Sequence, residues 1–135
     1  MTAHLTGPLA LFLALACGLT QAQDEMRNPY PPELKWIDMG RGIYARFSCP
    51  MCHGPNARGG AGPDLTDDRW IFQPSDRMLF NVIKYGRRGT MMPGYADELA
   101  DEQIWLVVSY LRFEEARRRA EADAAPIPAL PARSP

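Results

Sequence analysis

Two cysteines and a histidine stand in the spacing Cys-x-x-Cys-His, at Cys49, Cys52 and His53. This spacing is the signature of covalent c-type haem attachment. Thiols three residues apart at the end of a helix can reach the two vinyl groups on one edge of a porphyrin. The histidine that follows then lies below the ring centre, where an imidazole nitrogen can bind iron. The motif therefore predicts a chain that folds around one covalently bound haem c.

The first 23 residues carry no charged side chain, and residues 8–19 form an apolar run of the length found in secretory signal peptides. Thr20 and Ala22 fit a cleavage site, so we predict a signal peptide over residues 1–22 and a linker over 23–31. Cys17 offers a second interpretation, a bacterial lipoprotein signal, and a buried helix is a third. Either signal places the mature protein in the periplasm. It would meet a membrane only through a lipid on Cys17 or through a membrane complex.

The other end of the chain is polar. Residues 114–123 are helix-prone but polar on every face, and residues 124–135 hold four prolines and few apolar groups. We predict that residues 114–135 are a polar helix extension, with the Arg117–Arg119 triplet solvated, followed by a disordered tail. The folded domain is then residues 32–113, small enough to need a cofactor as a staple. A net charge of -1 argues against a nucleic-acid-binding protein.

Three segments show the apolar spacing of helices. The first follows Pro32 and runs to about Phe47, and the third covers residues 101–113. The second covers residues 76–85, with Ser75 as the predicted N-cap and Gly86 as the predicted stop. The long loop between the first two is rich in glycine and proline, which is unusual in so small a domain unless something packs against it. The pattern predicts an all-α fold of three to four helices wrapped around the haem.

Two other uses of a Cys-x-x-Cys pair fit the chain less well. A thioredoxin-like dithiol stands beside a βαβ pattern, and no segment here alternates convincingly with the period of a strand. A structural zinc site needs about four ligands. Without the signal segment, only Cys49, Cys52 and His53 remain as cysteine or histidine ligands.

A second axial ligand for the iron can be sought by elimination. His4 is removed with the signal segment, so the remaining soft ligands are methionines. Met39 and Met78 fit the core faces of helices. Met91 and Met92 lie in a loop bracketed by glycine and proline, which can fold over the far face of a haem. The residues alone leave open which of the two binds, or whether both merely cover the haem edge.

Further pieces of sequence accompany the haem motif. They are Gly40 and Tyr44 before it, Gly62-Pro63-x-Leu65 after it, Met92-Pro93 in the loop, and Asp101-Glu-Gln-Ile-x-x-Val-Val-x-Tyr110-Leu111 near the end. With them, residues 36–112 resemble the monohaem class I c-type cytochromes. The resemblance implies that Met92 is the distal iron ligand, opposite His53. It also implies that the backbone carbonyl of Pro63 holds the histidine ring.

The small Gly40 would let the last helix cross the first closely, against Tyr110 or Trp105. Two features depart from the commonest family pattern. The stretch between the aromatic residue of the first helix and Cys49 is one residue longer, and the segment 67–71 is not universal. Both features resemble a subgroup of exported bacterial cytochromes that serve quinoprotein dehydrogenases or terminal oxidases.

Haem propionates need hydrogen-bond donors, and loop position makes Arg69, Trp70, Tyr85, Arg87 and Arg88 the candidates. Lys84, Arg87 and Arg88 also form the densest basic group of the domain, immediately before the methionine loop. Such a group fits either a partner-docking surface that uses charge complementarity or a solvated face.

With histidine and methionine on the iron, no coordination position remains for a substrate, and one-electron exchange is the chemistry left. We therefore predict an electron carrier, not an enzyme, between periplasmic redox partners such as a dehydrogenase or a terminal oxidase. A fixed cytochrome subunit of such a complex is the first alternative. A haem-based sensor is the second, and it requires Met92 to be absent from the iron or easily displaced.

Overall fold

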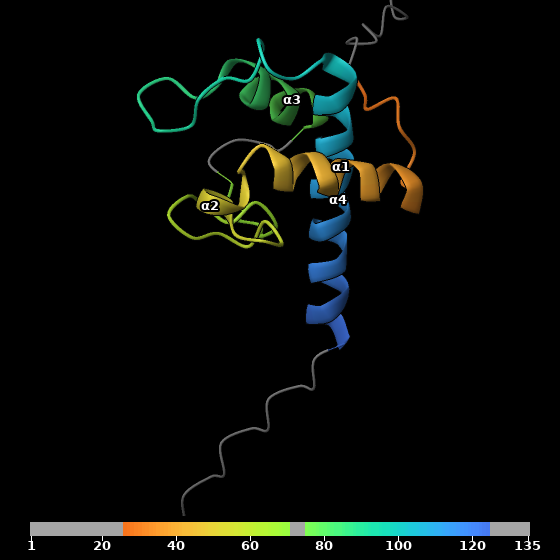
Figure 1. Cartoon of the computed structure of the whole chain (residues 1–135). Coiled ribbons are helices and arrows are strands. Elements are labelled where there is room, and N and C mark those ends of the chain that lie inside the picture. Colours follow the sequence, from red (N-terminus) through yellow and green to blue (C-terminus); the bar gives the residue numbers. More distant parts are fainter. Residues whose placement is uncertain (1–25, 71–74, 125–135) are drawn as a thin grey trace, which may run out of the picture.

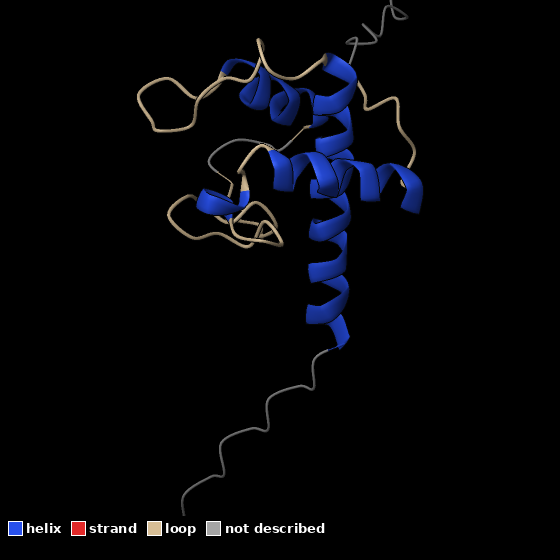
Figure 2. Cartoon of the chain, in the orientation of Figure 1, coloured by secondary structure: helices blue, strands red, loops and turns tan. Residues whose placement is uncertain are grey.

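The computed structural model describes residues 26–70 and 75–124, and these contain four helices and no strand. They are α1 (Leu34–Arg46), α2 (Pro50–His53), α3 (Asp76–Tyr85) and α4 (Asp101–Ala124), drawn in Figures 1 and 2. The prediction of an all-α fold is confirmed. The predicted signal segment with Cys17, the start of the linker and residues 125–135 lie outside the described residues. None of the described helices is long and apolar enough to span a bilayer.

The helix ends follow from local sequence signals. The hydroxyl oxygen of Ser75 accepts a hydrogen bond from the amide of Met78 at 3.2 Å, which caps α3 as predicted. Gly86, with φ of 73°, ends the same helix. Ala100 precedes α4 and has no capping side chain, but its amide donates to the side-chain oxygen of Gln103 at 2.9 Å. That bond satisfies one of the unpaired donors at the start of α4.

α1 crosses α4 at close range (Figure 1). A β-carbon on Gly40 would collide with the carbonyl oxygen of Leu106 and lie 3.1 Å from Cβ of Tyr110, so glycine permits the approach. The rings of Tyr44 and Tyr110 meet one turn further, with centroids 5.2 Å apart. The predicted crossing against Tyr110 is therefore correct. Trp105, the other candidate, instead stacks on a ring of α3.

The longer stretch between α1 and the haem motif is taken up by a tight turn. The amide of Cys49 donates to the carbonyl of Tyr44 at 3.2 Å, and the amide of Ser48 donates to the carbonyl of Ala45 at 3.3 Å. Ser48 has a left-handed φ of 59°. These bonds form a Schellman motif, with a serine where glycine is usual. The turn at Ser48 therefore ends α1 and places Cys49 at the N-cap of α2.

The apolar spacing located most of the core and misplaced one residue. Met39 is 46% exposed on α1, so its predicted place in the core is wrong, whereas Met78 packs against the core. Ile37 and Phe80 belong to the core as well, at 5% and 4% exposure. Phe80 is buried because its ring stacks on Trp105, with centroids 4.4 Å apart.

α4 continues without a break through the polar segment, which extends the preceding helix as predicted. The prediction that its arginine triplet is solvated is wrong for two residues. Arg117 pairs with Glu114, which is 5% exposed, and Arg118 pairs with Asp64 in the loop after α2. Only Arg119 remains largely in solvent, with 71% of its side chain exposed.

The segments that carry the predicted site lie on one side of α4. In Figure 1, α2 and the loop that follows it are on the left of this helix, near its middle. α3 and the segment 86–100 are on the same side, near its beginning. The haem motif and the methionine loop, about 40 residues apart in the chain, therefore face the same flank of the molecule.

Candidate haem site

His53 is the last residue of α2 and is buried, with 9% of its surface exposed. Its Nδ1 lies 2.9 Å from the carbonyl oxygen of Pro63, the hydrogen bond that the family resemblance implied. A carbonyl oxygen only accepts, so Nδ1 carries the proton and the lone pair of the neutral ring is on Nε2. The ring is thereby prepared to bind a metal through Nε2.

Both cysteines belong to the same short helix. Cys49 is its N-terminal cap and is half-buried, whereas Cys52 is exposed. Burial raises the pKa of the Cys49 thiol, contrary to the lowered thiol pKa of reactive Cys-x-x-Cys dithiols. Among residues 26–70 and 75–124, no group of three or more His, Cys, Asp or Glu side chains is placed to hold a metal ion.

The loop that begins at Gly54 is fastened to α2 and to two other helices. The amide of Gly59 donates to the carbonyl of His53, and the amide of Gly62 to the carbonyl of Cys52, both at 2.8 Å. The hydroxyl of Tyr44, on α1, donates to the Gly54 carbonyl at 2.8 Å. The hydroxyl of Tyr110, on α4, donates to the Pro55 carbonyl at 3.0 Å. These bonds hold the loop against the histidine.

The same loop is fastened again after Pro63. Oδ1 of Asp64 accepts from the amide and the hydroxyl of Thr66, at 2.8 and 2.7 Å, and Oδ2 pairs with Arg118. Arg118 also donates to the Thr66 hydroxyl oxygen at 2.9 Å. Burial raises the pKa of the Asp64 carboxyl, but the bonds from Thr66 and Arg118 outweigh burial and hold this pKa below its usual range. Sequence reasoning missed this cluster, although Asp-x-Thr is a turn-forming pattern.

The methionine loop is a closed turn. The amide of Arg87 donates to the carbonyl of Met92 at 3.0 Å, and the amide of Met92 donates to the hydroxyl oxygen of Thr90 at 3.2 Å. Met91 is 97% exposed, whereas Met92 is half-buried. The turn therefore turns the side chain of Met91 into solvent. The role of Met92 as an iron ligand stays a prediction.

The predicted propionate donors differ in their surroundings. Nε1 of Trp70 is buried with no hydrogen-bond partner among the described residues. A buried N–H without an acceptor is costly, so this indole fits a group supplied from outside the chain, such as a haem carboxylate. Tyr85 is 67% exposed, and Arg69 and Arg88 are also exposed. The backbone of Arg87 joins the methionine loop.

Lys84, a member of the predicted basic group, forms an ion pair with Asp101 at 2.6 Å. This pair joins the last turn of α3 to the first turn of α4. One of the three charges predicted for docking is thus already compensated within the chain.

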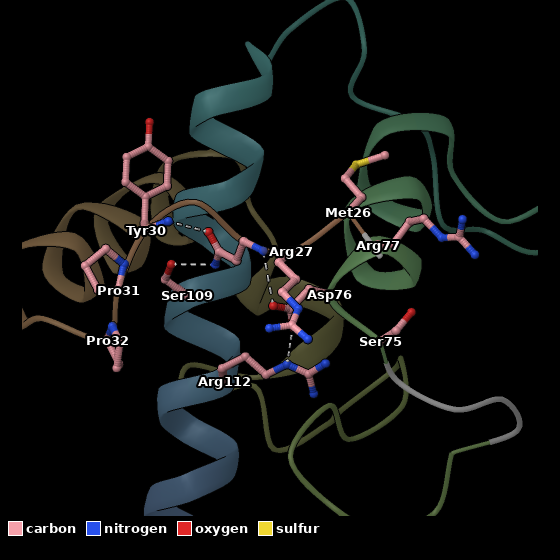
Figure 3. Close-up of a pocket in the computed structure, with 11 residues that line it drawn as sticks. Met26, Arg27, Tyr30, Pro31, Pro32, Ser75, Asp76, Arg77, Ser109 and Arg112 are labelled. Atoms are coloured by element: carbon pink, nitrogen blue, oxygen red, sulfur yellow. Dashed lines mark hydrogen bonds and ion pairs between the residues drawn. The ribbon is translucent and has the colours of Figure 1, made fainter. Parts of the chain in front are cut away.

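A surface groove of about 1030 Å³ lies away from these residues (Figure 3). It lies between the segment 26–32, the start of α3 and the middle of α4. Its floor is tied together by Asp76, which accepts from Arg112 at 2.8 Å, and by Asn28, which donates to Ser109 at 2.8 Å. None of the predicted haem-site residues lines it. The groove therefore lies where the segment 26–32 crosses α3 and α4.

Comparison with known proteins agrees with this geometry. The profile of a family described as cytochrome c oxidase, cbb3-type, subunit III matches residues 37–111. The chain belongs to this family. It is a c-type cytochrome of the class I fold, and its cofactor is haem c.

Three similar proteins illustrate the range of this family. The cytochrome is 37% identical over 121 residues to the cbb3-type cytochrome c oxidase subunit CcoP of Rhodobacter capsulatus, covering 82% of this chain and 39% of the relative. It is 30% identical over 93 residues to cytochrome c550 of Pseudomonas aeruginosa, covering 63% and 60%. The crystal structure of cytochrome cL from Hyphomicrobium denitrificans matches with a TM-score of 0.53 and 30% identity, over 57% of this chain and 46% of that one. The chain spans only 31–39% of the length of three cbb3-type subunits that it matches.

Proposed function

We propose that this cytochrome transfers single electrons through a haem c bound covalently by Cys49 and Cys52, with His53 and Met92 as the axial iron ligands. The observation that carries the proposal is the 2.9 Å bond from Nδ1 of His53 to the Pro63 carbonyl, because it leaves Nε2 for iron. The half-buried side chain of Met92, beside the exposed Met91, supports the choice of distal ligand.

The bound haem supplies a one-electron couple between Fe(III) and Fe(II). The residues of the chain select this chemistry over others. Two protein ligands leave no position for a substrate, so we infer a carrier, not an enzyme. Trp70 supplies an N–H for a haem propionate, because its buried Nε1 has no acceptor among the described residues. Arg69, Tyr85 and Arg87 are further candidates of the same kind.

We infer that its partners are redox proteins outside the cytoplasm, a dehydrogenase or a terminal oxidase. The signal-like segment 1–22 supports export, and the similarity to oxidase subunits supports an oxidase as the electron acceptor. The same similarity favours a second candidate function, a fixed cytochrome subunit of such a complex. Purification of the tagged chain from its own host in mild detergent separates the two. A carrier is recovered alone, and a subunit is recovered in constant ratio with a larger complex.

The ligand assignment is tested by Met92→Ala, with Met91→Ala as the matched control. We expect the first variant to lose the sulfur-to-iron charge-transfer band of the oxidised protein, to show a lower reduction potential and to bind carbon monoxide when reduced. Haem should stay covalently bound in both, since the cysteines are untouched. The control should keep the band, because its side chain points into solvent.

Two outcomes would contradict the proposal. If the band survives Met92→Ala and disappears in Met91→Ala, the distal ligand is Met91. If the unmodified protein has no such band and binds carbon monoxide readily, the chain is a sensor and not a carrier.

A further inference from the structure

The second half of α4 touches the loop that supports His53. Arg118 reaches Asp64 and Thr66 across more than 50 positions of sequence, and Arg58 of the same loop pairs with Glu121. The family profile matches residues 37–111, so these helix residues lie beyond the matched range, whereas Asp64 and Thr66 lie within it.

Arg118 acts one peptide unit away from the acceptor of the histidine. The carbonyl oxygen of Pro63 and the amide nitrogen of Asp64 belong to the same planar peptide. The direction of that carbonyl therefore depends on how Asp64 is held. Both carboxylate oxygens of Asp64 are engaged, one by Thr66 and the other by Arg118. Thr66 is itself buried, with 4% exposure, so the side chain that holds one carboxylate oxygen of Asp64 is fixed by its surroundings.

We propose that Arg118 is a positioning residue for the axial histidine: by holding Asp64, it keeps the Pro63 carbonyl aimed at Nδ1 of His53. This inference rests on the proposed function, in which His53 binds iron. A firm hydrogen bond from Nδ1 makes the imidazole a more basic ligand. A more basic ligand favours Fe(III), so loosening the cluster raises the reduction potential.

The sign of the potential shift separates positioning from plain electrostatics. Arg118→Gln removes a cation, which by Coulomb interaction alone lowers the potential, and Asp64→Asn removes an anion, which alone raises it. If the pair positions the carbonyl, both variants raise the potential. The double variant then shifts no further than the larger single one, because both changes break one unit. Arg119→Gln is the matched control: it removes the same charge one residue on, from a side chain that is 71% exposed and pairs within its own helix.

Amide hydrogen exchange supplies a readout that does not involve the iron. The amides of Gly59 and Gly62 bond to the carbonyls of His53 and Cys52. In the haem-loaded full chain, we expect Arg118→Gln to speed their exchange about tenfold, because local opening of the loop costs less. Arg119→Gln should leave the rates unchanged.

The inference is overturned if Arg118→Gln and Asp64→Asn shift the potential in opposite directions and add in the double variant. It is equally overturned if Arg118→Gln leaves the loop exchange at the rate of the control. A different result would refute the proposed function itself. That result is an unmodified protein that carries no covalent haem, or whose haem shows no low-spin spectrum. Unresponsive variants of a normal cytochrome would refute the positioning role alone.

Discussion

Ser48 shows how a single residue aims the haem motif. It follows α1 with φ of 59°, a conformation in which a β-carbon costs roughly 1–2 kcal/mol. The turn around it lets the amide of Cys49 bond back to Tyr44. The strain is thus accepted at the point where the chain must leave one helix and begin the next.

Ser48→Gly should relieve this strain and stabilise the protein. We expect the free energy of unfolding to rise by roughly 0.5–1 kcal/mol, the strain removed less the added freedom of the unfolded chain. Guanidinium unfolding of the haem-loaded protein, followed by far-UV circular dichroism, measures the change. Ala45→Gly, in the last turn of α1, is the control and should destabilise by about as much. Equal losses in both variants would mean that the left-handed turn carries no strain.

At the scale of elements, the crossing of α1 and α4 is the main packing contact between helices. Each helix then sends a tyrosine hydroxyl to the loop after α2, from Tyr44 to Gly54 and from Tyr110 to Pro55. The distance between the two helices is therefore also what places the loop under His53.

Gly40→Ala should separate the two helices, because the new β-carbon would meet the backbone of Leu106. We expect a loss of about 1–3 kcal/mol or more, the usual cost of overpacking. Gly42→Ala is the matched control in the same helix, where a β-carbon meets nothing within 4 Å. It should gain roughly 0.5–1 kcal/mol from helix propensity. Thermal unfolding measures the stability of both variants. If Gly40→Ala were as stable as the unmodified protein, the helix crossing could accommodate a β-carbon at residue 40.

The second half of α4 shows why a sequence can predict a helix without predicting which of its residues contact the rest of the protein. Its Glu and Arg residues recur at helical spacing, and pairs such as Arg117 with Glu114 and Glu121 form within the helix. The same pattern suits a helix that is solvated on every side. Only contact with the loop distinguishes Arg118 from Arg119, because both are arginines in one polar run.

At the scale of the whole molecule, the pair of Asp64 and Arg118 joins the middle of the chain to its last helix. The pKa of Asp64 is lowered in the folded state, so its carboxylate stabilises the fold above its ordinary pKa of about 3.9. That stability is lost as the pH falls through the lowered value. Glu121, whose pKa is also lowered, mainly by its bond from Arg58, adds to the same trend.

Asp64→Asn should therefore destabilise the cytochrome most near neutral pH. The difference from the unmodified protein should shrink below about pH 4 and vanish once Asp64 is protonated in both states. Urea unfolding of the two haem-loaded proteins across this range measures it. A difference that is the same at every pH would show that the carboxylate charge contributes nothing to stability.

The sequence by itself determined the haem motif, the all-α class, the caps of α3 and the small residue at the helix crossing. These signals are local: His53 follows the cysteines at fixed spacing, Ser75 caps its own helix, and Gly40 is small wherever it lies. Tertiary structure alone decided which arginine of the triplet reaches the loop after α2, and that Met39 faces solvent while Phe80 is buried. Those outcomes depend on contacts between residues tens of positions apart, and a contact of that kind leaves no periodicity in the chain. Asp64 and Arg118 read as ordinary surface charges until the crossing of α1 and α4 brings the loop to the last helix.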